Sequence, residues 1–577
     1  MTNKKLIYIL IIASLTFSSC KKFLDRPPLD TITDKEMSFT KTEMELYANQ
    51  YYLNFSDFLS VFYGDNNSDN MVFGNFDYNP LLAGTKTLSI YGGGWDWSNI
   101  RSVNYFLANY QVTKEPLTEV NTYIGEIYFW RAWFYFGLMK QFGDLPWYNA
   151  PLATNSTLLY APRISRSIIA DSILADLDRA ASLLDPITKS VPQRIHKDVA
   201  LAFKARVALY EGSWEKYHDG TPFGVQNADY VKYFQQAAAA SEQIMNSGYY
   251  SISVGTNPKW DYWNLFNQLD LSGNRDVIFW RKYNFSLGLT HNGQAFLLFE
   301  GGNTGLSKQL VDDYLCADGL PISLSPLYKG DDSIAEVVNN RDPRLGQTIF
   351  VRGYPRVIHN GDTITKFSEP DINQSLDQRN TTGYELFKGA APNIEPQGAG
   401  AGNAAGATTA SIIFRYAEVL LIYAEANAEL GTCTQQVLDA SINRLRDKVT
   451  MPHLLQSVGF TDPKWDFPGL SGLINEIRRE RRVELACENF RFDDLMRWAA
   501  TDLIKKPLLG AKYSQFVGKT FTPPLSGIPV NADGYIFPYL NTQAANGWQF
   551  DPSKNYLSPI PTNELTINPS LVQNPGY

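Results

Sequence analysis

The sequence has few of the residues that most often carry enzyme chemistry. Its five histidines are far apart, and none belongs to an HExxH motif that would bind a catalytic zinc ion. It has no GxSxG motif, which speaks against a serine hydrolase that uses a nucleophile elbow. The glycine-rich stretch 398–410 has no P-loop lysine, so it does not predict a phosphate-binding loop. These absences favour a protein that binds its ligand without reacting with it.

Cysteine and positive charge are also scarce. After Cys20 the chain has only three cysteines, too few and too scattered for a disulfide framework or a CxxC metal site. The net charge of -8 argues against a nucleic-acid partner, because binding phosphates calls for a basic surface. After the N-terminal segment, no apolar run reaches the roughly 18 residues that a membrane-spanning helix needs. Aromatic residues are plentiful instead, with 33 Tyr, 33 Phe and 12 Trp, and they suit a surface that stacks on sugars or peptides.

The N-terminal segment predicts export followed by lipidation. Two lysines, an apolar run over 6–17 and two serines precede Cys20, which is the layout of a signal peptide over 1–19. The pattern resembles a lipobox, although Phe17 stands where leucine is commoner, and an ordinary signal peptide is the alternative. Each buried methylene contributes about 0.8 kcal/mol, so more than one acyl chain on Cys20 would make a lasting anchor. Residues 20–34 contain two consecutive prolines and are predicted to be an extended tether.

The mature chain carries helical periodicity in several long stretches. Apolar residues recur at three to four residue intervals, and two of the helices contain Arg131 and Arg206, about 75 residues apart. That spacing is about two units of a 34-residue helical hairpin, which indicates tetratricopeptide-like stacking. In these stretches small residues are interleaved with large ones and a glycine ends the run. The predicted helices cover 35–55, 97–110, 125–146, 165–184, 197–212, 412–431 and 472–488.

The amino-acid composition changes between residues 251 and 410. Glycine, asparagine, aspartate and proline are frequent there, and only 276–285 reads as a clear strand. The sequence therefore predicts a mainly α protein, in which a helical-repeat scaffold carries a loop-rich insert with short strands. We expect a helical-repeat region at 35–250, the irregular insert at 251–410 and a C-terminal region at 411–577.

Two charged patterns favour structural roles. Glu480, Arg481, Glu484 and Glu488 are spaced on one side of a predicted helix, and the three-residue spacing of Arg481 and Glu484 suits an ion-pair network. Arg415 with Glu418 is assigned the same structural role. Acidic residues number 59, so a pair of glycosidase carboxylates cannot be chosen from the sequence.

The loop at 65–69 has the D-x-N-x-D spacing of a calcium loop. Asn70 replaces the expected glycine and Phe76 the expected glutamate, which excludes an EF-hand. An Asx-rich turn is favoured, with a looser calcium site as the alternative. No metal ligand is predicted.

Ligand contacts are predicted in loops whose aromatic and amide residues are not explained by helical spacing. A sugar ring packs its C–H face on an aromatic ring, while its hydroxyls need carboxylate or amide partners. Trp97 stands three residues before Ile100 and is assigned to the core. The candidate ligand-binding residues are Tyr63, Asp65, Asn67, Tyr91, Trp95, Tyr262 and Trp263.

Several strings, considered together, resemble one protein family. In order they are CKKFLDRPP, WSNIRSVN, GEIYFWRAWFYFGLMKQFGDLP, DVALAFKARVALYEGSW, NRDPRL, FRYAEVLLIYAEANAEL, RRERRVELACENFRFDDLMRW, YLSPIP and QNPGY, and they extend from residue 20 to residue 577. Each is weak alone, but their order is that of the SusD/RagB outer-membrane lipoproteins of Bacteroidetes, which the chain resembles.

The resemblance implies a SusD-like α/α superhelix and a lipid-anchored location in the outer membrane, facing the cell exterior. It also implies a partner, a SusC-like TonB-dependent transporter on which the protein sits as a lid. Members of the family capture oligosaccharides in most systems and peptides in some, without a cofactor. We therefore expect a non-catalytic protein that binds oligosaccharides, and the alternatives are a surface-anchored glycoside hydrolase, a peptide-binding member of the family or a docking scaffold.

Overall fold

The computed structural model of the chain describes residues 38–393 and 406–577, so the predicted signal peptide and tether lie outside the described residues. Helices make up most of the regular structure, and the expected mainly α fold is confirmed. None of the described helices is both long and apolar enough to cross a membrane. The longer helices are α3 (Lys41–Asn49), α5 (Ser98–Asn109), α6 (Leu117–Phe142), α7 (Arg166–Leu183), α8 (Lys197–Tyr217), α9 (Tyr230–Asn246), α15 (Tyr416–Glu429) and α18 (Gly472–Glu484).

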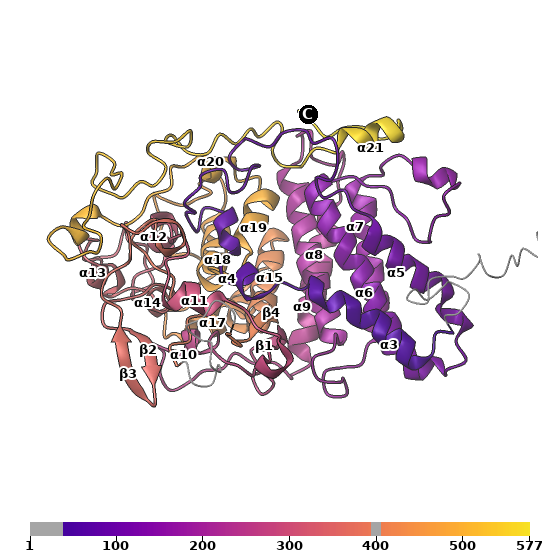
Figure 1. Cartoon of the computed structure of the whole chain (residues 1–577), viewed down its shortest axis with the longest axis horizontal. Helices are drawn as coiled ribbons and strands as arrows, with labels where there is room; N and C mark the ends of the chain where they lie inside the picture. The colour runs from indigo at the N-terminus through magenta and orange to yellow at the C-terminus, as the bar shows by residue number, and fades with distance from the viewer. Residues whose placement is uncertain (1–37, 394–405) are drawn as a thin grey trace, which may run out of the picture.

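The first half of the chain builds a layer of stacked helices. Helices α6, α7, α8 and α9 pack each against the next, while α3 and α5 cover the free side of α6 (Figure 1). Large and small residues alternate along this layer, so Trp130 is fully buried beside the small Ala132. Stacking supplies the core that no single hairpin could bury alone.

The ends of these helices differ from the expected ones at several points. Helix α6 begins at Leu117, directly after Pro116, and ends before Gly143, whose φ of 75° an L side chain rarely adopts. Helix α3 begins later than expected because Thr40 and Glu43 form a capping box. The expectation that Gly212 ends α8 is wrong, since this glycine lies inside the helix against Phe234. Helix α9 was not expected at all.

A two-stranded sheet joins the insert to the C-terminal region. Strand β1 (Val277–Arg281) pairs antiparallel with β4 (Ser411–Arg415), which leads directly into α15. The strand at 276–285 is thereby found, but the helix expected over 412–431 is strand for its first residues. Ile278 and Phe279 belong to the core of the helical layer, while Val277 and Trp280 belong to a second core under the insert. The sheet therefore lies between the two cores.

The insert is built from short elements and loops. A hairpin of β2 (Pro355–His359) with β3 (Asp362–Lys366) projects from the molecule on the side away from the helical layer (Figure 1). After α18 the chain runs back along one side of the molecule to α21, beside the helical layer (Figure 1). The short helices are α4 (Phe58–Phe62), α10 (Asp261–Asn264), α11 (Gly293–Leu298), α12 (Lys308–Asp313), α13 (Ile334–Val338), α14 (Pro343–Thr348), α16 (Gln435–Ala440), α17 (Ile442–Lys448), α19 (Arg491–Arg497), α20 (Thr501–Ile504) and α21 (Thr562–Ile567).

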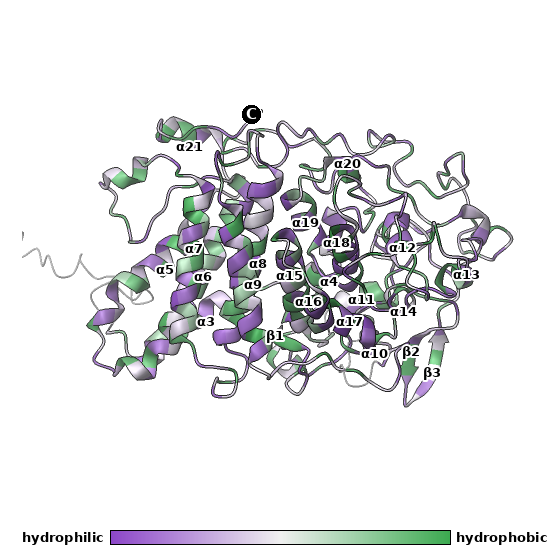
Figure 2. Cartoon of the chain, turned by 180° about the vertical axis from the view of Figure 1, so that it is seen from behind, coloured by the Kyte–Doolittle hydropathy of each residue, from purple (hydrophilic) through white to green (hydrophobic). Residues whose placement is uncertain are grey.

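Helix α18 is hydrophilic and yet buried between the two halves (Figure 2). The predicted ion-pair network is found: Glu476 and Arg479 pair along the helix at 3.3 Å, and most of the other charges pair with residues of other elements. Arg481 pairs with Asp494 at 2.9 Å, and Glu484 pairs with Arg415 at 2.7 Å. Glu418 pairs with an arginine of α8. Long side chains reach other helices here because the interior offers them partners and no water.

Candidate ligand-binding site

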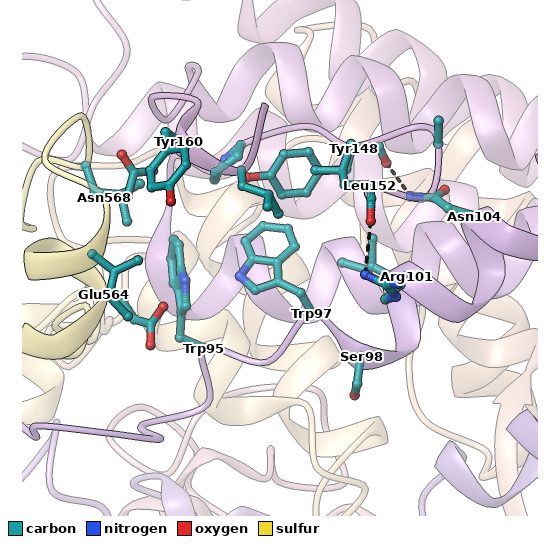
Figure 3. Close-up of a pocket in the computed structure, with 16 residues that line it drawn as sticks. Trp95, Trp97, Ser98, Arg101, Asn104, Tyr148, Leu152, Tyr160, Glu564 and Asn568 are labelled. Atoms are coloured by element: carbon teal, nitrogen blue, oxygen red, sulfur yellow. Dashed lines mark hydrogen bonds between the residues drawn. The ribbon is translucent and has the colours of Figure 1, made fainter. Parts of the chain in front are cut away.

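A cavity of about 410 Å³ opens where α5 begins, beside the loop from α6 to α7 and helix α21 (Figure 3). We call it the aromatic pocket. Three segments far apart in the sequence meet there. The residues that line it are Trp95, Trp97, Ser98, Ile100, Arg101, Asn104, Pro146, Tyr148, Ala150, Leu152, Leu159, Tyr160, Glu564, Ile567, Asn568 and Leu571.

Two tryptophans form one wall of the aromatic pocket. The rings of Trp95 and Trp97 lie 5.4 Å apart at 76°, and both remain half-buried. Phe142 supports Trp95 from behind at 4.9 Å, and Tyr148 meets Trp97 at 5.2 Å. The turn at 92–94 places Trp95 there, because its three glycines all have positive φ. Each ring is thus fixed by other rings while part of its surface stays accessible.

Polar groups lie around the tryptophans. Arg101 donates from Nη1 to the carbonyl of Leu152 at 3.1 Å, and Asn104 donates to the carbonyl of Tyr148 at 2.8 Å. Figure 3 shows Glu564 beside Trp95, whereas Arg101 lies beyond Trp97. Among the described residues, neither Arg101 nor Glu564 has an ion-pair partner. The aromatic pocket therefore offers a cation at one end, a carboxylate at the other and stacking surface between them.

Two of the sequence-predicted residues lie at or near this pocket. Trp95 lines it directly. Tyr91 is 71% exposed and lies just before the glycine turn, but it does not line the cavity. Its neighbour Ile90 accepts a hydrogen bond from the backbone N–H of Asn563 at 3.1 Å, which ties this loop to α21.

The loop at 63–67 lies elsewhere and is largely engaged with the protein. Asp65 is 1% exposed and accepts hydrogen bonds from Asn70 at 2.9 Å and from the backbone of Cys487 at 2.8 Å. Burial raises the pKa of this carboxyl above its usual value, and the hydrogen bonds oppose the shift. Tyr63 packs on Phe296, with ring centres 6.2 Å apart. Asp65 therefore presents no surface to a ligand in this conformation.

Asn67 and Asp69 complete the D-x-N-x-D pattern without forming a cation site. Asp69 accepts from Arg491 at 2.7 Å and from Arg482 at 3.0 Å, and these guanidinium groups hold its pKa at about 2 against the effect of burial. Among the described residues, no cluster of three or more His, Cys, Asp or Glu could hold a metal ion. Asn67 is half-buried and lines a second cavity, which shares no lining residue with the aromatic pocket.

The two candidates in the insert are part of its core. Tyr262 is fully buried, donates to the carbonyl of Glu484 at 2.5 Å and accepts from Lys388 at 2.6 Å. Trp263 stacks on Phe387 with ring centres 4.9 Å apart and planes within 8°. Both side chains pack in or against the second hydrophobic core, so neither of them lines the aromatic pocket.

Sequence reasoning missed most of the residues in this pocket. Trp97 was assigned to the core from its spacing to Ile100, although one part of its ring faces the cavity. The loop at 146–160 contains prolines and tyrosines that helical spacing does not explain, which is the same kind of pattern that singled out the loop at 91–95. Glu564 and Asn568 come from the C-terminal tail, and only the tertiary fold brings them there.

Two family models match the chain and together cover most of it. The model described as "SusD family" matches residues 269–577, and the one described as "Starch-binding associating with outer membrane" matches residues 25–209. Two SusD-like proteins of Formosa agariphila are similar in sequence. One is 25% identical over 485 residues, covering 83% of this chain and 78% of the relative. The other is 23% identical over 534 residues, covering 89% and 95%.

Solved structures share the fold. A SusD-like carbohydrate binding protein from Bacteroides fragilis matches with a TM-score of 0.72 and 23% identity, covering 93% of this chain and all (100%) of that one. A surface glycan-binding protein from Bacteroides fluxus matches with a TM-score of 0.57 and 20% identity, covering 95% of this chain and 100% of that one. Since the first of the family models alone spans more than half of the sequence, the chain belongs to the SusD family.

Proposed function

We propose that this protein is a non-catalytic lipoprotein of the outer membrane that captures oligosaccharides in the aromatic pocket. It passes them to a SusC-like TonB-dependent transporter in the same membrane. The observation that carries the ligand class is the pair of half-buried, rigidly supported tryptophans at Trp95 and Trp97, flanked by hydrogen-bonding side chains. The description of the family model that matches residues 25–209 names starch binding and the outer membrane, which agrees with this proposal.

The geometry suits a sugar because it combines flat apolar surface with polar edges. The Trp95 and Trp97 rings can receive the C–H faces of pyranose rings, and their near-perpendicular planes suit two sugar units that turn relative to each other. Arg101, which is exposed and lies beside Trp97, can meet hydroxyl groups at the edge, whereas the buried amide of Asn104 is held by Tyr148 and Arg131 and supports the pocket from behind. Because Phe142 and Tyr148 already fix the tryptophans, binding costs little side-chain ordering.

The same pocket is poorly equipped for glycoside hydrolysis. That reaction uses two carboxyl groups about 5 to 10 Å apart across the scissile bond. Of the described residues that line the pocket, Glu564 is the only acidic one. This supports binding without catalysis over the alternative of a surface glycosidase.

The direct test is calorimetry of the mature protein with maltohexaose, xylohexaose, cellohexaose and a tryptic peptide mixture. Trp95→Ala should weaken binding of the best oligosaccharide by about 1 kcal/mol or more, which is about fivefold in affinity. Phe285→Ala is the matched control, because Phe285 is 52% exposed and lies in the insert, away from this pocket. Equal affinity of both variants would remove the aromatic pocket from the proposal, and peptide binding alone would replace its ligand class.

The catalytic alternative has its own measurement. Incubation of the protein with each oligosaccharide should release no new reducing ends. Release that is lost in a Glu564→Gln variant would make the protein a glycosidase.

A further inference from the structure

A second cavity system adjoins the glycine turn at 92–94 through Gln141 and is lined by none of the residues of the aromatic pocket. One cavity of about 440 Å³ is bounded by the loop at 67–86, the end of α6 and the start of α19. Another of about 230 Å³ continues between α6, α8 and β4. The two share Gly137, Lys140, Asn489 and Asp493, so they meet over α6 and form one groove, which we call the α6 groove.

Gly137 is the residue at this junction that packing does not explain. It lies inside the 26-residue helix α6, where glycine costs about 1 kcal/mol relative to alanine. A Cβ added there would meet no described atom within 4 Å, whereas one added at Gly125 of the same helix would meet Leu184 at 2.9 Å. Gly125 is therefore explained by close packing of α6 on the end of α7. Gly137 instead leaves the floor of the groove open where the two cavities meet.

The walls of the α6 groove carry aromatic rings together with charges that are mostly neutralised by ion pairs. Tyr78 is 47% exposed, and Phe490 and Phe492 are half-buried at the rim. Lys140 pairs with Asp493 at 2.6 Å, and a second ion pair, between Arg206 and Glu418 at 2.6 Å, lies on the floor. Lys86 is the one charged lining residue with no ion pair among the described residues. Since the other charges are already paired, the groove favours a ligand that is uncharged over most of its length. Rings, amides and open floor together suit a neutral saccharide chain.

The two sites also share a wall. Gln141 lines the α6 groove, donates from Nε2 to the carbonyl of Gly93 at 2.7 Å, and accepts on its backbone oxygen from Ser558 at 2.8 Å. Gly93 belongs to the turn that positions Trp95 in the aromatic pocket. A ligand in the groove therefore lies next to the turn that shapes the pocket.

We propose that the α6 groove is a second saccharide-binding site, which holds a further segment of a long or branched neutral glycan and depends on the missing side chain at Gly137. The ligand class rests on the proposed function, but the position of the site does not.

Two variants at one position test the groove. Gly137→Ala should raise the melting temperature, because alanine favours the helical conformation more than glycine does and its Cβ meets no described atom within 4 Å. This variant should keep most of its affinity for oligosaccharides. Gly137→Leu should fold, since the space is open, and should weaken binding of the hexasaccharides by about tenfold or more. Affinity for the matching disaccharides, which are short enough to be held by the aromatic pocket alone, should stay unchanged. Unchanged hexasaccharide affinity of a folded Gly137→Leu protein would overturn the proposal.

Crystals soaked with maltohexaose, cellohexaose or xylohexaose separate this inference from the proposed function. Sugar density in both sites supports both. Density only in the aromatic pocket overturns the groove and leaves the proposed function intact, whereas density only in the groove supports the groove and overturns the role of Trp95. Empty density at both sites with all three sugars overturns the groove as a site for these neutral glycans and the pocket with it.

Discussion

Glu215 is a buried carboxyl whose environment favours the protonated form. It is fully buried in α8, and neither of its oxygens has a hydrogen-bond partner within the described chain. Burial raises its pKa from 4.5 to about 8, with a further contribution from Glu211, against the opposing charges of Arg166 and Lys232. The folded protein therefore holds a proton that the unfolded chain releases above its ordinary pKa. The contribution of Glu215 to stability thus falls as the pH rises from about 4.5 to about 8.

Glu215→Gln removes this charge and should change the pH dependence of stability. At pH 5 we expect the variant and the parent to unfold at similar temperatures, because both are neutral at this position. At pH 9 the variant should be more stable by about 1–3 kcal/mol, the usual cost of an unsatisfied buried polar group. Calorimetric melting at both pH values measures the difference.

Glu211→Gln is the matched control, since Glu211 pairs with Arg166 at 2.8 Å and its loss should destabilise the protein at both pH values. A Glu215→Gln protein whose stability relative to the parent is the same at pH 5 and pH 9 would contradict the assigned protonation.

At the residue scale, the sequence predicted that aromatic and polar loop residues form the ligand surface, but it did not identify most of the individual residues. Trp95 could be singled out because three glycines precede it and no helical spacing explains it. Tyr262 is also an aromatic loop residue that helical spacing does not explain, but it is buried. From sequence alone, an aromatic residue in a loop that covers a core cannot be told apart from one in a loop that borders a cavity. Burial depends on residues such as Glu484 and Lys388, which are distant in sequence.

Helix α18 shows how an element can be predicted while its contacts are not. A helix was predicted over 472–488, and the structure shows it over Gly472–Glu484 with Ser471 as its cap. Spacing placed Arg481 and Glu484 in an ion-pair network, but it did not identify their partners, which lie on other elements because the helix is buried between two halves. Hydrophobic periodicity shows which face of a helix is apolar, but it does not show which residues that face contacts.

The ion pairs of α18 should be costly to break singly. Glu484 is buried between Arg415 and Arg344, at 2.7 Å and 2.8 Å, and these charges hold its pKa at about 2 against the effect of burial. Glu484→Gln leaves a buried guanidinium without its full partner and should destabilise the protein by about 3 kcal/mol or more in urea unfolding.

An exposed pair gives the comparison. The side chains of Lys282 and Asp270 are 49% and 50% exposed, so Lys282→Met should change stability by less than about 1 kcal/mol. Similar effects of Glu484→Gln and Lys282→Met would show that the buried network contributes no more than a surface pair. The low pKa of Glu484 adds that its contribution is present above pH 4.5 and is lost as the pH falls towards 2.

At the scale of the whole molecule, the sequence predicted the class of fold but not how its parts join. The strand at 276–285 was recognised, yet its partner was read as the start of a helix. Because the sheet of β1 and β4 contributes residues to both hydrophobic cores, it connects the insert to the helical layer. The C-terminal tail, which no periodicity could place, returns to the helical layer and contributes Glu564 and Asn568 to the aromatic pocket.

The proposed function requires the binding sites to stay beside a membrane transporter, and Cys20 is the residue predicted to hold them there. Cys20→Ala should be exported but should move from the membrane pellet to the soluble fraction after cell lysis, because the acyl chains that supply the anchor cannot be attached. Metabolic labelling with a palmitate analogue should mark the parent and not the variant. Cys433→Ala is the control, because this buried cysteine of the folded body has no part in anchoring and its loss should leave both readouts unchanged. Retention of Cys20→Ala in the membrane after a high-salt wash would show that something other than a lipid on this cysteine holds the protein.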